Sequence, residues 1–283
     1  MQISLVIPVF NEEATIARAL DRVLVQRDAV HEVLVCDNNS TDRTRAIVEE
    51  YAAHLPIRVI DVPVQGTVHA RNAGFDAATG EIIARIDADA LIEPGWFDAV
   101  ASFFEAADED VAAVTGAMIH FDMPRFRFDP FVRYYVDDPA ERKRCEPVQF
   151  ATIVGSNMAI RRKAWMSVRG AVNTAPGIWE DVDLAWALVE SGYRTMLSPA
   201  MAAQVSGRRL LDPPRAYYRY TRSVVTTVRE RGRADLQLAA RVHVVLSMVN
   251  YFVRYFPART WDPVERRYDW RLLRLEREAR PIP

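Results

Sequence analysis

The first ninety residues alternate between short apolar runs and segments whose apolar residues recur at helical spacing, and this alternation restricts the fold more than any other feature. The apolar runs are residues 3–9, 33–36, 57–62 and 82–86. Each run is continuous rather than alternating, as in strands that are buried on both faces. Parallel strands need crossover connections, and the intervening segments can supply helices. The pattern predicts an α/β fold with a mostly parallel sheet and helices on both faces.

Polar loops follow the predicted strands at the edge where ligands of such sheets bind. These loops are residues 8–12, 37–42, 66–72 and 87–89. In open α/β sheets ligands bind beyond the carboxyl ends of the strands. The sequence therefore places a candidate binding site at this edge.

The alternation ends near residue 100, and the rest of the chain gives shorter signals. We predict strands at 111–119, 150–154 and 193–197, helices at 161–168 and 180–191, and helical structure from residue 213 onward. The segment 121–146 is rich in aromatic residues, proline and charge, and we assign it no structure.

The composition favours a globular protein of a reducing cytoplasm. Half of the residues are hydrophobic and 26% are charged, which suits a folded core. The formal net charge of -2 argues against general nucleic-acid binding. Cys36 and Cys145 form no C-x-x-C pair, so we expect neither a disulfide framework nor a zinc site. The first residues lack the basic start of a secretory signal, and no run reaches the ~18 uninterrupted apolar residues of a membrane span.

Two residues in the polar loops have the chemistry that a mononucleotide needs. The carboxylate of Asp37, at the end of the second strand, can accept hydrogen bonds from a base N–H or from ribose hydroxyls. A turn or cap residue is the alternative. Arg71, at a helix start, can reach a phosphate or a base, or merely bridge to Asp37 or Asp87. Ala73 and Gly74 are small, which predicts close packing of that helix on the sheet.

An Asp-x-Asp pair follows the fourth strand. Asp87 and Asp89 are separated by one residue, so on an extended strand their side chains share a face. Like charges this close repel each other unless a cation lies between them or they point apart. A divalent cation there would bridge diphosphate oxygens and stabilise the charge on a leaving nucleotide. A solvated loop is the structural alternative.

A second acidic motif opens a predicted helix about ninety residues later, at Trp179-Glu180-Asp181-Val182-Asp183. Acidic residues at a helix N-terminus also suit the helix dipole, which is the structural alternative. The functional interpretation makes Asp181 a general base that takes a proton from an acceptor hydroxyl. Asp183 lies two residues further along and is predicted to face away. Together, the two acidic motifs predict metal-assisted group transfer from a phosphorylated donor.

The C-terminal part of the chain contains a basic stretch. Eight arginines occur between residues 205 and 233, against Asp212 and Glu230. A diphosphate, a lipid phosphate or an anionic membrane surface would suit them, and so would a solvated helix face. Arg208 and Arg209 are nearest in sequence to the predicted site, and we assign them to phosphate contact.

An apolar stripe at helical spacing follows, over residues 236–256, and Arg241, His243 and Arg254 interrupt it. Core packing or a dimer face is the default interpretation of such a stripe. Attachment to a membrane interface is the alternative.

Motifs for other chemistries are absent from the sequence. The chain has no G-x-x-x-x-G-K-[ST], no G-x-G-x-x-G, no H-E-x-x-H and no G-x-S-x-G. The five histidines do not cluster in sequence.

The motifs resemble those of glycosyltransferase family 2, an inverting family with the GT-A fold. The resemblance extends over about residues 3–210, and its specificity comes from six motifs that occur in order. They are Ile7-Pro8-Val9-Phe10-Asn11-Glu12-Glu13, Val35-Cys36-Asp37-Asn38-Asn39-Ser40-Thr41-Asp42, Ala70-Arg71-Asn72-Ala73-Gly74, Asp87-Ala88-Asp89, Gly155-Ser156-Asn157-Met158-Ala159-Ile160-Arg161-Arg162 and Trp179-Glu180-Asp181.

This resemblance implies a nucleotide-sugar site, a divalent cation (Mg²⁺ or Mn²⁺) and a general base. The cation is assigned to Asp89 with Asp87, and catalysis to Asp181 with Glu180. The residues assigned to the nucleoside diphosphate are Pro8, Phe10, Glu12, Asp37, Asn38, Arg71, Asp87, Arg208 and Arg209.

The chain departs from the family's pattern in three ways. Asn38 stands where many relatives have a second Asp, which alters the expected base contacts. No His follows Asp181 at the usual distance for a further metal ligand, and residues 205–208 occupy that region. The Gln-x-x-Arg-Trp motif and the membrane helices of processive polysaccharide synthases are absent, which favours the addition of a single sugar.

The sequence thus predicts a cytoplasmic enzyme that moves one sugar, with inversion, from a nucleoside-diphosphate sugar to a hydroxyl or lipid phosphate of a glycan or lipid-linked acceptor. A sugar-phosphate nucleotidyltransferase is one alternative, but it would need a Gly-rich loop and a Lys near the N-terminus, where this chain has Pro8-Val9-Phe10-Asn11. A non-catalytic sugar-nucleotide-binding module is the other.

The expected organisation is a GT-A domain at 1–210, with a nucleotide-binding half at 1–90 and an acceptor half at 91–210. A helical extension follows at 211–283. We expect this extension to contact the inner face of the membrane or to form a homodimer.

Overall fold

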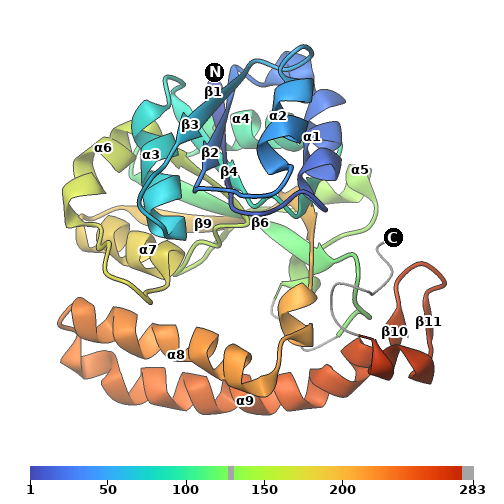
Figure 1. Ribbon diagram of the computed structural model, residues 1–283. Helices are drawn as coiled ribbons and strands as arrows, with labels where there is room; N and C mark the ends of the chain where they lie inside the picture. Colours follow the sequence, from blue (N-terminus) through green and yellow to red (C-terminus); the bar gives the residue numbers. More distant parts are fainter. Residues whose placement is uncertain (127–130, 276–283) are drawn as a thin grey trace. The chain divides into compact units, whose positions relative to one another are not determined.

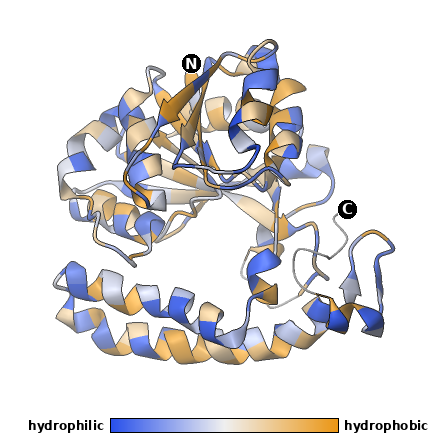
Figure 2. Cartoon of the chain, viewed as in Figure 1, coloured by the Kyte–Doolittle hydropathy of each residue, from blue (hydrophilic) through white to orange (hydrophobic). Residues whose placement is uncertain are grey.

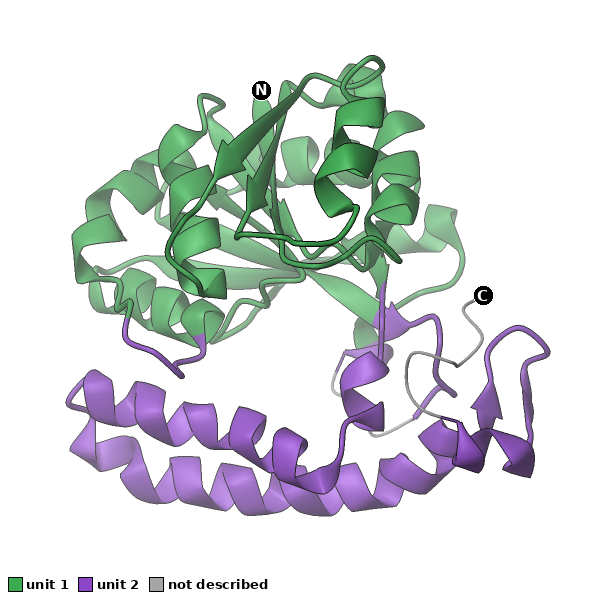
Figure 3. Cartoon of the chain, viewed as in Figure 1, with its two compact units in different colours: residues 1–118, 134–174, 180–204 green, residues 119–133, 175–179, 205–283 purple. Residues whose placement is uncertain are grey.

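The computed structural model describes residues 1–126 and 131–275, which form two compact units (Figure 3). The first unit contains residues 1–118, 134–174 and 180–204, and the second contains 119–133, 175–179 and the chain from 205 onward. The helical segment predicted from residue 213 lies in the second unit, together with two short segments from earlier in the chain.

Four parallel strands form one half of the large sheet, and they coincide with the four apolar runs of the sequence. The elements are β1 (Ile3–Val9), α1 (Ile16–Leu24), η1 (Arg27–Ala29), β2 (Glu32–Asp37), α2 (Thr44–Tyr51), β3 (Ile57–Asp61), α3 (Thr67–Ala77) and β4 (Ile82–Ile86). The strands pair in the order β3-β2-β1-β4, all in parallel (Figure 1). Leu5, Val6 and Ile7 on β1 are all fully buried, because helices cover both faces of the sheet.

The other half of the sheet is not parallel. Its strands are β5 (Ala90–Ile92), β6 (Val111–His120), β7 (Val148–Gln149), β8 (Asn157–Arg161) and β9 (Arg194–Val205). Strand β8 runs antiparallel to β4 and to β6. Among the described residues, the sheet has nine strands, in the order β3-β2-β1-β4-β8-β6-β9-β5 with β7 paired to β9. The remaining helical segments of this part of the chain are α4 (Trp96–Ala106), η2 (Val132–Tyr134), α5 (Pro139–Arg142), α6 (Arg162–Val168), η3 (Arg169–Ala171) and α7 (Glu180–Glu190).

One predicted strand was misplaced, because residues 150–154 contain no strand and β8 begins at Asn157. A polar residue after Gly155-Ser156 suggests a turn, yet Asn157 is fully buried. Its amide accepts a hydrogen bond from Trp96 Nε1 at 2.9 Å and donates to the backbone oxygen of Met201 at 2.8 Å. A buried amide is stable in a strand when such partners are present, and both partners lie far away in the sequence.

Close packing of α3 on the sheet follows from small residues, as the sequence predicted. Gly74 lies so near the sheet that an added Cβ would be 2.4 Å from Val6 Cγ1 and 2.7 Å from Cys36 Sγ. The next residue, Phe75, makes an edge-to-face contact with Trp165 of α6, with ring centroids 5.2 Å apart. These contacts fix α3 between the strands and α6.

The second unit is built on two long helices. They are α8 (Pro214–Glu230) and α9 (Gln237–Thr260), accompanied by η4 (Arg208–Leu211), η5 (Ala234–Leu236), the hairpin strands β10 (Trp261–Asp262) and β11 (Arg267–Tyr268), and η6 (Trp270–Arg274). Tyr217 of α8 stacks on Tyr251 of α9 at 4.3 Å, and the Tyr251 hydroxyl donates to the backbone oxygen of Asp212 at 2.6 Å. The predicted helical extension is therefore confirmed as far as residue 260, and a short hairpin follows it.

One helical stretch in the described parts of the chain, Ala234–Thr260, is long and apolar enough to cross a membrane by length and composition alone. Hydrophobic residues recur along α9 (Figure 2). Only 17% of its apolar 18-residue window is buried, although α9 contributes Tyr251 and Ala258 to the core of its unit.

We expect Gly74→Ala to lower the free energy of unfolding by about 1–3 kcal/mol, because the added methyl group overpacks the contact of α3 with Val6 and Cys36. Gly170→Ala is the matched control, since a Cβ at Gly170 meets nothing within 4 Å. Urea denaturation of the two variants measures the difference. Equal stability of both variants would show that α3 can move away from the sheet without cost.

Candidate functional site

The loops after β1 and β2 are tied together by hydrogen bonds. The Asn11 backbone N–H donates to Ser40 Oγ at 3.1 Å, and Asn11 Oδ1 accepts from the Thr41 N–H at 2.8 Å. The carboxylate of Asp37, which is 7% exposed, accepts the Ser40 N–H at 2.9 Å. Asn11 and Asn39 adopt left-handed φ values of 53° and 67°, which asparagine tolerates better than most residues. The two loops therefore form a connected unit around Asp37.

Asn38 connects the loop after β2 to the loop after β3. Its Nδ2 donates to the backbone oxygens of Val62 and Val64, both at 2.8 Å, and its Oδ1 accepts the Gly66 N–H at 2.7 Å. A carboxylate could not donate to the two backbone oxygens, so the amide suits this position better than the Asp of many relatives. The structure thus places Asn38 as a buried loop clamp.

The three residues predicted at the end of β1 differ in exposure. Pro8 is half-buried within the strand, Phe10 directly after it is 47% exposed, and Glu12 is half-buried. Glu12 Oε2 accepts a hydrogen bond from Thr15 Oγ1 at 2.7 Å. Of the three, Phe10 presents its apolar side chain to solvent beside the connected loops.

Arg85 joins the two acidic motifs. This residue lies on β4 with a side chain that is 2% exposed. Its Nη2 donates to Asp87 Oδ1 at 3.0 Å, and its Nη1 donates to Glu180 Oε1 at 2.8 Å. Burial disfavours the charged form of the guanidinium and by itself would lower the pKa of Arg85. The carboxylates of Asp87 and Glu180 together have the larger effect and hold the pKa of Arg85 above its ordinary value. The structure therefore brings together two motifs that lie about ninety residues apart.

A glycine makes this arrangement possible. A Cβ at Gly155 would lie 2.6 Å from Arg85 Nη1, so any side chain there would displace the guanidinium. The Gly155 N–H also donates to Asp181 Oδ2 at 3.2 Å. Gly155 therefore gives space to Arg85 and a hydrogen bond to the predicted base.

Arg71 lies behind the second acidic motif, where it is fully buried. Its Nη1 donates to the backbone oxygen of Glu180 at 2.8 Å, and its guanidinium lies 5.8 Å from the ring centre of Phe75 and 5.9 Å from that of Trp165. Burial lowers the pKa of Arg71 to about 10, so the group is still a cation at neutral pH. In this buried location Arg71 positions Glu180. The resemblance to the family implies a different role for Arg71, as a contact to the nucleotide.

The two carboxylates at the start of α7 have opposite pKa shifts. Burial opposes the ionisation of Glu180, but Arg85 and Arg71 outweigh it and hold the pKa of Glu180 below its ordinary value. Burial, together with the negative charge of Glu180, raises the pKa of Asp181 to about 6. A carboxylate with a pKa near neutrality is suited to accept a proton during a reaction.

Asp183, which the sequence predicts to face away from Asp181 as a charge of the helix, is not a surface charge. Asp183 is fully buried, and its Oδ2 accepts the backbone N–H of Asn173 at 2.8 Å. The carboxylate thus fixes the segment that precedes α7. All three acidic residues at the start of this helix have a structural or chemical role inside the first unit.

Asp87 and Asp89 lie in the turn between β4 and β5 rather than on an extended strand, because β4 ends at Ile86. The Asp87 side chain is 42% exposed. Within residues 1–126 and 131–275, no group of three or more His, Cys, Asp and Glu could hold a metal ion. Magnesium is commonly held by one or two carboxylates together with substrate phosphates. Asp87 and Asp89 are the two carboxylates that the sequence assigns to such a cation.

Arg208 and Arg209 belong to the second unit. The Arg209 guanidinium lies over the ring of Tyr220, 4.0 Å from its centre. The loop before them is held by Asp122, whose carboxylate accepts hydrogen bonds from Ser206 Oγ and from the next backbone N–H, both at 2.6 Å.

Trp179 precedes Glu180 in the chain and is anchored within the second unit. Its backbone N–H donates to Thr227 Oγ1 at 2.8 Å, and its Nε1 donates to the backbone oxygen of Tyr220 at 3.2 Å. Its ring also contacts His243 edge to face at 5.5 Å. Trp179 is therefore held within the second unit by both α8 and α9.

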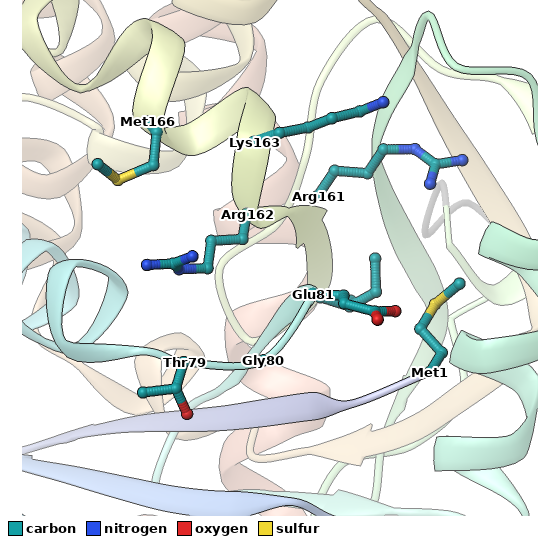
Figure 4. A pocket seen from close by; sticks show the side chains of 9 residues that line it. Met1, Thr79, Gly80, Glu81, Arg161, Arg162, Lys163 and Met166 are labelled. Carbon is teal, nitrogen blue, oxygen red and sulfur yellow. The ribbon is translucent and has the colours of Figure 1, made fainter.

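A cavity of about 360 Å³ lies at the amino ends of β1 and β4, at the opposite edge of the sheet from the acidic motifs (Figure 4). Its cationic side chains have structural partners. Arg161 Nη2 donates to the backbone oxygen of Ala107 at 3.0 Å, and Arg162 Nε donates to that of Ala78 at 2.9 Å, directly after α4 and α3 end. We therefore place the candidate site at the carboxyl edge.

The sequence profile of Glycosyl transferase family 2 matches residues 4–168. An uncharacterized glycosyltransferase of Nostoc sp. is 34% identical over 125 residues, which cover 44% of this chain and 37% of that protein. The UDP-Glc:alpha-D-GlcNAc-diphosphoundecaprenol beta-1,3-glucosyltransferase of Escherichia coli is 36% identical over 87 residues, which cover 31% of this chain and 34% of that protein. The matches thus span about a third of the length of these two curated relatives.

A solved structure with a similar fold is the mannosyltransferase of Pyrobaculum calidifontis in complex with GDP-Man and Mn²⁺. Its TM-score is 0.62 at 23% sequence identity, and the match covers 91% of this chain and 73% of that chain. At this identity the similarity concerns the fold alone, and it confirms the GT-A fold predicted from the sequence.

We expect Arg85→Met to lower the free energy of unfolding by about 3–5 kcal/mol, because the change leaves Glu180 with an uncompensated buried charge. Arg58→Met is the matched control: Arg58 is 51% exposed and pairs with Glu32, so its loss should cost about 0–1 kcal/mol. Urea denaturation measures both. Equal losses would mean that the buried pair contributes no more than a surface pair.

Proposed function

This chain belongs to glycosyl transferase family 2, and we propose that it transfers a single sugar from a nucleoside-diphosphate sugar to an acceptor, with inversion. The observation that carries the proposal is the bridge from Arg85 to both Asp87 and Glu180. This bridge connects Asp87, which we assign with Asp89 to a cation, to Glu180, the neighbour in sequence of the carboxylate that we assign to the proton. Group transfer from a diphosphate needs both.

The nucleotide is assigned to the connected loops at the carboxyl edge. Asp37 accepts hydrogen bonds from the base or ribose, and the exposed Phe10 offers an apolar surface beside it. Asp87 is assigned to the ribose and diphosphate, and together with Asp89 it would hold the cation. Arg208 and Arg209 are assigned to the phosphate, whereas Asn38 and Arg71 act by holding the loops and Glu180 in place.

Asp181 acts as the general base in this proposal. The acceptor O–H bond breaks as its proton passes to a carboxylate oxygen of Asp181, and the acceptor oxygen bonds to the anomeric carbon of the donor. The bond between that carbon and the diphosphate oxygen breaks at the same time, which releases the nucleoside diphosphate. Attack from the face opposite to the leaving group inverts the configuration. Glu180 stays ionised beside Arg85 and tunes Asp181 through its charge.

A divalent cation, Mg²⁺ or Mn²⁺, is assigned to Asp89 and Asp87. When bound there, it neutralises charge that develops on the departing diphosphate.

The proposed base defines the chemical group that the acceptor must offer. A hydroxyl of a glycan or of a lipid-linked sugar fits a mechanism with a carboxylate base. The Escherichia coli relative, named for a diphosphoundecaprenol-linked acceptor, supports the lipid-linked choice. We therefore propose a cytoplasmic enzyme that works at or near the inner face of the membrane.

Turnover of candidate donors tests the proposal against its alternatives. A glycosyltransferase hydrolyses one nucleoside-diphosphate sugar slowly without acceptor, and this hydrolysis depends on Mn²⁺ or Mg²⁺. A nucleotidyltransferase would instead release pyrophosphate from a nucleoside triphosphate and a sugar phosphate. A binding module would bind a nucleoside-diphosphate sugar and turn over none of them.

We expect Asp181→Asn to lower kcat by about 10²–10⁴-fold and to leave donor affinity unchanged, because the amide cannot take the proton. In the wild type, kcat/KM should fall as the pH drops below about 6, where Asp181 becomes protonated. Glu50→Gln on the exposed face of α2 is the control and should keep wild-type rates. Turnover near that of the wild type in the Asn variant would remove Asp181 from the role of base.

We expect Asp89→Ala to weaken the binding of UDP or GDP, whichever the protein prefers, by at least tenfold when Mn²⁺ is present. This factor corresponds to about 1.4 kcal/mol, and the reason is that the cation links the carboxylate to the diphosphate. Without metal, the wild type and the variant should bind the nucleotide equally. Calorimetry with and without Mn²⁺ measures this, and Asp98→Ala on α4 is the control. A loss of the same size under both conditions would make Asp89 a direct or structural contact.

A further inference from the structure

Helix α9 carries an exposed apolar stripe along its whole length. At 100° per residue, the stripe occupies an arc of roughly 120°. Each of its eight side chains is between 48% and 74% exposed. They are Leu238, Val242, Val245, Leu246, Val249, Phe252, Val253 and Phe256. Core packing, the default interpretation from the sequence, therefore does not account for them.

The three residues that interrupt the apolar pattern in sequence lie off the stripe. Arg254 is buried on the other side of α9, where its guanidinium lies 4.6 Å from the ring centre of Phe126. His243 contacts Trp179. Arg241, like Arg259 further along, falls at one border of the arc. The stripe is thus free of charge and has cations at one edge, as in helices that lie in a membrane interface.

Charge is distributed very unevenly along the chain. Residues 205–275 contain fifteen arginines and six acidic residues, a net charge of +9, whereas residues 1–204 carry a net charge of -11. From Gln237 to Thr260 there is no acidic residue. The helical part of an acidic protein is therefore basic, which suits an anionic surface.

Aromatic and cationic side chains continue the stripe beyond its C-terminal end. Trp270 is 66% exposed and contacts Phe256, with ring centres 5.6 Å apart. In the hairpin after α9, Tyr268 is 55% exposed and is preceded by the exposed Arg266 and Arg267. Tryptophan, tyrosine and arginine are the residues that favour the boundary between lipid and water.

We propose that α9 lies in the plane of an anionic lipid membrane with this stripe inserted among the acyl chains. A membrane-spanning orientation would expose the other face of the helix to lipid, and that face packs on α8 through Tyr251 and Tyr217. A symmetric dimer would place two copies of the same basic region against each other, where like charges repel. An anionic membrane can bury the apolar stripe among its acyl chains and attract the positive net charge with its headgroups. The proposal concerns attachment and does not depend on the reaction.

Vesicle flotation of the full chain tests this surface without any measurement of activity. We expect the protein to float with vesicles of mixed phosphatidylglycerol and phosphatidylcholine at low salt, and far less with phosphatidylcholine alone. High salt should weaken the binding, because salt screens the arginines. Absence of flotation with the anionic vesicles at low salt would overturn the proposal, and equal binding to neutral vesicles would overturn the anionic requirement.

The double variant Leu246→Glu/Phe252→Glu removes two anchors from the stripe and should lower vesicle partition by on the order of a hundredfold. Both positions are more than half exposed, so the fold should persist, and circular dichroism checks it. The matched control is Val25→Glu/Val189→Glu, the same kind of change at exposed apolar positions of the first unit, and it should float like the wild type. Flotation that survives the first double change would overturn the role of α9. A dimer in analytical ultracentrifugation that dissociates with that change, without flotation, would assign the stripe to self-association instead.

Discussion

The buried guanidinium of Arg85 is the interaction on which the candidate site depends. A charge with 2% of its side chain exposed is costly to bury unless opposite charges and hydrogen bonds compensate it. Asp87 and Glu180 provide this compensation from two distant parts of the sequence, and Gly155 provides the space. Once Arg85 is buried, neither acidic motif can move away without leaving an uncompensated charge. The geometry of the site is therefore enforced by electrostatics as well as by packing.

The same pair also sets the chemistry of the neighbouring carboxylate. Because Arg85 and Arg71 keep Glu180 ionised, a fixed negative charge lies next to Asp181. That charge adds to the effect of burial, and together they raise the pKa of Asp181 to about 6. In the proposed mechanism the two adjacent carboxylates have different tasks, Glu180 as a fixed anion and Asp181 as a proton acceptor. Pairs whose pKa values are pushed apart in this way are typical of acid–base sites.

The sequence predicted the features that depend on residue type and local spacing. It missed the contacts that depend on partners far away in the sequence. The four parallel strands were readable because their apolar runs are continuous, and the acidic motifs because carboxylates at strand and helix ends are conspicuous. From the sequence alone, Arg85 falls in an apolar strand, Asn157 follows the turn residues Gly155 and Ser156, and Asp183 is a charge of a helix. Each of these polar groups is buried beside a partner on another element, and such partners are defined only by the fold.

The two residues on either side of the boundary between the units, Trp179 and Glu180, are each held within their own unit. Trp179 is held by Thr227 and Tyr220 of α8 and contacts His243 of α9, and its peptide bond leads directly to Glu180. Within the first unit, the start of α7 is held by Arg71, which donates a hydrogen bond to the backbone oxygen of Glu180. The backbone contact to Arg71 and the side-chain contact to Arg85 hold Glu180 at both ends, so its negative charge stays beside Asp181.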